Sequence, residues 1–118
     1  MPGQCKFPRA ERLTKKSDYR LVFEHGEKLV GRRFICYMVR REEQGCKLGV
    51  AVSRRVGKAV VRNRIKRYVR EFYRTHRPAF VTGVQVVVVA RPSCAALDYR
   101  ACADAMGQLF QRGGVLDG

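Results

Sequence analysis

Residues 58–76 read KAVVRNRIKRYVREFYRTH, and this stretch decides the fold that the sequence predicts. Its apolar residues recur at the three-to-four-residue period of an α-helix that buries one face. Pro78 ends the helix because the residue before a proline resists helical dihedral angles. We therefore expect one long helix from about Lys58 to about His76. Its predicted core face consists of Val61, Ile65, Tyr68, Val69, Phe72 and Tyr73.

The opposite face of this predicted helix is densely cationic. Glu71 is the only acid within residues 54–77, against ten basic residues. Like charges four residues apart destabilise a helix by a few tenths of a kcal/mol per pair, and a helix that is only solvated usually intersperses glutamates. We interpret the face as a phosphate-binding surface, with a merely solvated face as the alternative. Four cations follow at steps of four residues along one edge: Arg62, Lys66, Arg70 and Arg74.

The composition of the whole chain points to the same kind of partner. Its 118 residues contain 25 Lys plus Arg and 10 Asp plus Glu, which gives a net charge of +15. Such a charge strains a small domain unless a polyanion relieves it. The 18 arginines outnumber the 7 lysines, and arginine pairs with phosphate and stacks on bases. Nucleic acid is therefore the leading candidate, ahead of an anionic membrane surface.

Several classes of protein are excluded or disfavoured. The longest apolar run, residues 86–90, is far too short to span a membrane, and no apolar secretory segment begins the chain. The five cysteines form no Cys-x-x-Cys pair, and neither His25 nor His76 stands near them at ligand spacing. We expect free thiols in a reducing cytoplasm, no metal site in the chain and no catalytic residue.

The elements around the long helix complete a single domain. We expect a helix over residues 14–23 that stops at Gly26, and strands over residues 33–39 and 48–52 joined as a hairpin. A buried strand over residues 84–90 and a helix over residues 98–112 follow. The order α-β-β-α-β-α indicates an α+β sandwich over residues 13–114, between a flexible basic arm (1–12) and a short tail (115–118). A parallel strand–helix–strand crossover would be right-handed by the general rule.

Residues 57–67, GKAVVRNRIKR, resemble the signature of the bacterial ribonuclease P protein component, with its Arg-Asn-Arg motif. The stretches 12–26, 50–57 and 87–92 resemble the flanking elements of that family in the same order, so the likeness covers roughly residues 12–111. A lone Arg-Asn-Arg would be weak evidence, whereas the long signature with ordered flanks is specific.

The resemblance implies both a fold and a function. The family fold is similar to the second domain of ribosomal protein S5 and has a left-handed βαβ crossover, so we expect that hand here against the general rule. Ribonuclease P removes the 5′ leader from precursor tRNA, and in bacteria the catalyst is an RNA subunit with bound Mg²⁺. We therefore expect this chain to bind that RNA subunit and the precursor tRNA, with no obligatory protein partner and no membrane.

The resemblance also assigns residues to two surfaces. The predicted contacts with RNA that match the family are Arg54, Arg55, Lys58, Arg62, Asn63, Arg64, Lys66 and Arg67. Arg70 is added to them from the cationic face of the predicted helix. The aromatic positions of the leader-binding cleft are matched by Tyr19, Phe23 and Tyr37, while Phe34 on the same strand lines that cleft or backs it. Tyr19 replaces a phenylalanine that is common in the family. Bases of a single strand stack on such rings at ~1–3 kcal/mol each with little sequence preference. Core packing is the alternative role for these rings.

Three other functions remain open at this stage. A protein nuclease needs clustered carboxylates, and the ten acids here are scattered. A helix for the DNA major groove usually follows another helix in a helix-turn-helix, whereas strands precede this one. A plain RNA-binding structural protein, such as a ribosomal component, fits charge and size equally well, and only the long signature separates the two.

Overall fold

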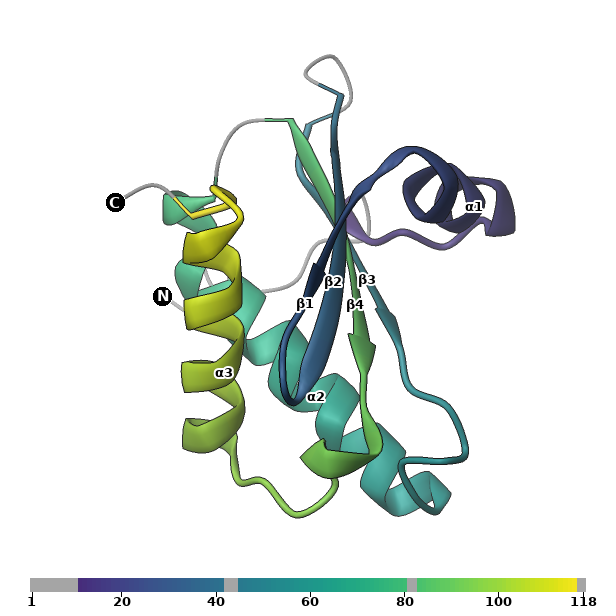
Figure 1. Cartoon of the computed structure of the whole chain (residues 1–118), viewed down its shortest axis with the longest axis vertical. Coiled ribbons are helices and arrows are strands. Elements are labelled where there is room, and N and C mark those ends of the chain that lie inside the picture. The colour runs from purple at the N-terminus through teal and green to yellow at the C-terminus, as the bar shows by residue number, and fades with distance from the viewer. Residues whose placement is uncertain (1–10, 42–44, 81–82, 117–118) are drawn as a thin grey trace.

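The computed structural model describes residues 11–41, 45–80 and 83–116, which form a four-stranded mixed sheet covered by helices on both faces (Figure 1). The elements, in chain order, are α1 (Lys16–His25), β1 (Glu27–Val30), β2 (Phe34–Arg40), β3 (Lys47–Ala51), α2 (Ala59–His76), β4 (Val84–Ala90) and α3 (Tyr99–Arg112). Two short 3₁₀ turns, η4 (Arg77–Ala79) and η5 (Pro92–Cys94), flank β4. The predicted α+β class is confirmed.

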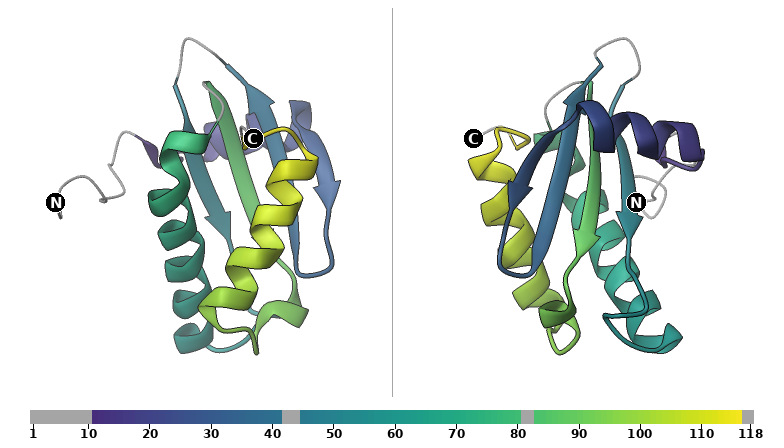
Figure 2. Two further views of the ribbon diagram at one scale, coloured as in Figure 1. Left: turned by 90° about the vertical axis from the view of Figure 1, so that its left-hand side faces the viewer. Right: turned by 45° about the vertical axis from the view of Figure 1, so that its right-hand side comes forward.

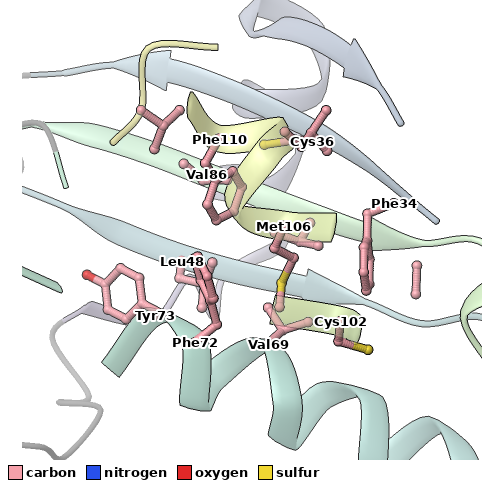
Figure 3. Packing of buried hydrophobic residues seen from close by; sticks show 14 of the residues in the cluster. Phe34, Cys36, Leu48, Val69, Phe72, Tyr73, Val86, Cys102, Met106 and Phe110 are labelled. Atoms are coloured by element: carbon pink, nitrogen blue, oxygen red, sulfur yellow. The ribbon is translucent and has the colours of Figure 1, made fainter. Parts of the chain in front are cut away.

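The core has two unequal parts, one on each face of the sheet. Helices α2 and α3 cover one face and α1 covers the other (Figure 1). β4 lies in the middle, so its Val86 and Val88 pack toward α2 and α3 while Val87 packs toward α1, and burial on both faces is confirmed. The larger core is closed by aromatic and thioether side chains of the helices (Figure 3), among them Phe72, Tyr73, Met106 and Phe110.

The strand order β1-β2-β4-β3 corrects two expectations. The predicted hairpin between the strands at 34–40 and 47–51 is wrong, because β4 lies between them and pairs antiparallel with β2 and parallel with β3. The true hairpin joins β2 to β1, a strand the sequence pattern did not reveal. β1 is a four-residue edge strand whose side chains are mostly exposed, so it lacks the alternation of a half-buried strand.

The β3–α2–β4 crossover is left-handed, as the resemblance predicted. In the left view of Figure 2, α2 stands in front of the sheet, β3 and β4 both run downward, and β4 lies to the right of β3. The chain runs down β3 at the back, returns upward through α2 at the front, and enters β4 to the right of β3. This path is a left-handed turn. Nearly all such connections have the opposite hand.

The helix limits follow the predicted signals closely. α2 begins one residue after Lys58, and α3 begins after Asp98, whose carboxylate accepts a hydrogen bond from the Ala101 N–H at 2.9 Å. α1 ends before Gly26, as expected. Gly26 has an ordinary negative φ of −80°, and its role is steric, because a Cβ there would lie 2.3 Å from the Val22 carbonyl oxygen.

The folded unit is longer at both ends than the predicted 13–114. Of the predicted arm, residues 1–10 lie outside the described residues, but Glu11 and Arg12 are bound to the body of the domain. Of the predicted tail, Val115 is buried and Leu116 forms a β-bridge with Phe80. Among the described helices, none has the length and apolarity to cross a membrane.

Candidate nucleic-acid interface

The basic face of α2 is held outward by the burial of its other face. Ile65 and Val69 are fully buried under the sheet, which turns Asn63, Arg67 and Arg70 to the solvent. Arg62 and Lys66 are half-buried along the same helix, and the Arg62 Nε donates to the Gly57 carbonyl at 3.1 Å. The approach to the helix adds exposed cations at Arg54, Arg55 and Lys58. We call these residues of α2 and its approach the cationic surface.

Besides Arg62, two further arginines of α2 are engaged within the protein. Arg74 forms a salt bridge with Glu71 on the same helix. Arg64 is half-buried and donates from a terminal nitrogen to the Ala95 carbonyl at 2.6 Å. Its Nε is buried and has no hydrogen-bond partner among the described residues. The structure thus turns the predicted RNA contact Arg64 toward the connection between β4 and α3.

Three of the four predicted aromatic residues form a cluster on the α1 face of the sheet. The Phe23 ring meets the Tyr37 ring edge-on at 4.8 Å between centroids, and the Tyr19 ring lies 6.4 Å from Phe23. Phe23 is 40% exposed, whereas the two tyrosines are half-buried. Lys28 places its ammonium group 5.7 Å from the centre of the Tyr37 ring. The cluster offers partly open ring faces beside a positive charge, which suits single-stranded bases.

Phe34 does not belong to this cluster, and its placement in the lining of the cleft is corrected. Successive side chains of a strand point to opposite faces, so Phe34 lies on the other face of β2 from Tyr37. It is 1% exposed within the core under α2 and α3 (Figure 3). Phe34 supports the sheet from behind.

The cationic surface and the aromatic cluster meet at the outer edge of β3. A hollow of about 180 Å³ lies there, and both Tyr19 of the aromatic cluster and Arg70 of the basic face of α2 line it. Its remaining walls are Arg12, Leu13, Thr14, Leu48 and Val50. Sequence reasoning missed Arg12 and Thr14 because it assigned the first to a flexible arm and gave the second no role.

The described residues do not fit a magnesium site of their own. Nowhere in residues 11–41, 45–80 and 83–116 do three His, Cys, Asp or Glu side chains come together as metal ligands. Thiol chemistry is also suppressed, since burial raises the pKa of Cys36 and of Cys102 to about 12. The four described cysteines are free and buried, and Cys5 lies outside the described residues.

Comparison with known proteins identifies the family. Residues 7–114 match the ribonuclease P family. A ribonuclease P protein component from Desulforapulum autotrophicum is 39% identical over 93% of this chain and 94% of its own length. One from Dictyoglomus thermophilum is 35% identical over 97% of both chains.

Solved structures agree in fold. The Staphylococcus aureus RNase P protein superimposes with a TM-score of 0.86 at 25% identity, covering 92% of this chain and all of that one. The Thermotoga maritima RNase P protein gives 0.78 at 29% identity, over 86% of this chain and 96% of that one. The chain therefore belongs to the ribonuclease P protein family, the protein components of a tRNA-processing ribonucleoprotein.

Proposed function

We propose that this chain binds the catalytic RNA subunit of ribonuclease P and the single-stranded 5′ leader of precursor tRNA, and so assists removal of that leader. The cationic surface of α2 contacts the RNA subunit, and the aromatic cluster of Tyr19, Phe23 and Tyr37 holds the leader. The single observation that carries the proposal is that these two surfaces adjoin at the outer edge of β3. One protein can therefore touch both RNAs where they converge.

The contribution of the protein is electrostatic and positional. Its cations neutralise phosphates at the junction of two polyanions, which raises substrate affinity and lowers the magnesium concentration that cleavage requires. The Mg²⁺ ions are held mainly by the RNA subunit, because the described residues offer no cluster of carboxylates. Those ions supply the activated water and the stabilisation of the leaving group.

The rings suit a substrate of variable sequence. Stacking depends on the π-face that every base has, so it discriminates little among leaders. The proposed partners are the RNA subunit and precursor tRNA in the cytoplasm, with no obligatory protein partner. The catalytic centre lies in the RNA, so this chain acts as a subunit of an endonuclease without a catalytic residue of its own.

A cleavage assay at low, near-physiological Mg²⁺ tests this proposal. A precursor tRNA with a 5′ leader is incubated with the protein alone, the cognate RNA subunit alone, or both. Cleavage at the mature 5′ end only with both present supports the proposal. Cleavage by the protein alone favours a protein nuclease. Binding without stimulation favours a plain RNA-binding structural protein, the second candidate that charge and size support.

A further inference from the structure

Glu11 lies where a buried tyrosine and an arginine converge on one carboxylate. The Tyr73 hydroxyl donates to Glu11 Oε1 at 2.6 Å, and the Arg77 Nε donates to the same oxygen at 2.9 Å. Tyr73 belongs to α2 and is 1% exposed, while Arg77 begins η4. Burial and the bond to Glu11 raise the Tyr73 pKa, so the hydroxyl stays protonated and remains a donor. This arrangement is a clasp between the N-terminal segment and the end of α2.

The clasp lies at the start of a segment that runs along the outer edge of β3. Arg12 forms a parallel β-bridge with Leu48, and the Leu13 N–H donates to the Leu48 carbonyl at 2.9 Å. Leu13 is then buried in the smaller core beside Val22. We call residues 11–14 the strap. It is fixed at Glu11 by side chains and at Leu13 by the backbone, and Arg12 lies between these two points.

The strap builds one wall of the hollow described above. Arg12 and Thr14 come from the strap, Tyr19 from α1 and Arg70 from α2. The hollow is thus lined by two arginines from different segments and by one tyrosine. Arginine pairs with phosphate through a planar fork of donors, and a tyrosine ring accepts a base or ribose beside it. This is the chemistry that recognises one nucleotide of a single strand.

We propose that Glu11 is a positioning residue for RNA: it holds the strap so that Arg12 and Arg70 bind a phosphate of the single-stranded leader as it passes over the β3 edge beside Tyr19. This inference rests on the proposed function, since it assigns a further subsite for the same leader. It predicts that leaders long enough to reach the hollow bind better than very short ones. Glu11 itself touches no RNA and acts through Arg12.

The first experiment measures the clasp without RNA. Amide hydrogen exchange of Leu13 reports whether the strap stays on Leu48. Glu11→Ala and Tyr73→Phe in the full chain should each speed this exchange at least about tenfold, which corresponds to ~1.4 kcal/mol of opening free energy. Asp104→Ala is the control, because it also removes one carboxylate, but from an exposed position on α3. If amide exchange at Leu13 is unchanged in both variants, the clasp does not hold the strap and the inference is wrong.

The second experiment uses the holoenzyme assembled with its RNA subunit. Affinity and kcat/KM are compared for a precursor with a long leader and one with a single-nucleotide leader. Glu11→Ala should lower the affinity and kcat/KM for the long-leader substrate about five- to tenfold and leave both values unchanged for the short-leader substrate. Arg12→Ala, at an exposed side chain, should produce the same selective loss for the long leader. Glu11→Gln should give an intermediate loss, because an amide oxygen still accepts from Tyr73.

The outcomes separate this inference from the function beneath it. An equal loss for both substrates means that Glu11 has only a structural role or serves the RNA subunit, and the inference is then wrong. An undiminished long-leader affinity with a loosened strap also overturns it. If adding the wild-type protein to the RNA subunit improves neither substrate affinity nor cleavage, the proposed function fails and this inference fails with it.

Discussion

The Tyr19 ring lies directly against the backbone of Gly49 on β3. A Cβ atom at position 49 would stand 2.8 Å from Cε1, Cζ and Oη of that ring. Glycine at this position therefore lets the ring rest on the sheet at the junction of the aromatic cluster and the hollow.

Gly49→Ala should push the Tyr19 ring off the sheet. Overpacking of this kind costs ~1–3 kcal/mol, and we expect a several-fold loss of leader affinity beside the loss of stability. Thermal unfolding and holoenzyme binding measure the two effects. Gly107→Ala is the control, because its Cβ would meet the Phe72 ring at an ordinary 3.8 Å within α3, so stability should rise by about 0.5–1 kcal/mol. If Gly49→Ala changed neither stability nor leader affinity, the close approach of the Tyr19 ring to Gly49 would be contradicted.

The salt dependence of RNA binding should report the exposed cations of α2. Each phosphate contact contributes about 0.7–0.9 to the slope of log K against log salt. Arg67→Ala and Lys58→Ala, both at exposed positions of the cationic surface, should each reduce the slope for the RNA subunit by about that amount. Arg100→Ala removes the same charge from the exposed surface of α3 and should leave the slope nearly unchanged. Equal reductions for all three would mean that overall charge, and not the α2 surface, governs binding.

Arg64 should matter for stability more than its exposed neighbours do. Its bond to the Ala95 carbonyl holds α2 to the segment before α3. Losing a hydrogen bond to a charged, partly buried group costs ~1–3 kcal/mol, and lysine does not restore the planar fork. Arg64→Lys should therefore lower the denaturation midpoint clearly, while Arg67→Lys should change stability by at most about 0.5 kcal/mol. Identical midpoints for the two variants would refute this role.

Phe34 and Tyr37, three residues apart on β2, should respond oppositely to truncation. Phe34→Ala opens a cavity in the main core and should cost ~3–5 kcal/mol of stability, with no selective effect on leader binding. Tyr37→Ala should cost less stability, and should weaken leader affinity by an amount in the range of ~1–3 kcal/mol per stacked base. Denaturant unfolding and holoenzyme binding of each variant measure both quantities. A selective leader defect in Phe34→Ala would return Phe34 to the cleft.

Alkaline pH should destabilise the fold through its buried thiols. Folding raises the pKa of Cys36 from an ordinary 9.0 to about 12. Between these values the unfolded chain has lost a proton that the folded chain retains, so stability is full below pH 9 and falls as pH rises toward 12. The slope is ~1.4 kcal/mol per pH unit for one thiol. Denaturation of wild type and Cys36→Ala at pH 8 to 11 should give a shallower slope for the variant, and parallel slopes would count against this cause.

Local periodicity was enough to predict α2, β4 and α3 nearly to the residue, because Pro78, Asp98 and the run at 84–90 are signals within one element. The pairing of β2 was mispredicted because its partner β4 lies about 50 residues away, whereas hairpin reasoning looks only to the next strand. β1 was missed because an exposed edge strand such as Glu27–Val30 carries no apolar face.

The sequence predicted which residues form the candidate site better than it predicted where their side chains point. A helical wheel identifies Arg64 as a surface position, but it does not reveal that the side chain reaches Ala95, 31 residues away. Alternation along β2 could have separated Phe34 from Tyr37, since the two differ by an odd number of positions. Glu11 meets Tyr73 across 62 residues, and no local pattern signals such a contact.

The central position of β4 also fixes the order in which the protein can be completed on the ribosome. β2 and β3 have no partner between them until residues 84–90 have been synthesised. α2 leaves the exit tunnel earlier, and Ile65 and Val69 gain their full cover only when β4 and α3 follow. The nascent chain therefore exposes a strongly cationic helix with an unfinished apolar side, next to ribosomal RNA, before it can fold.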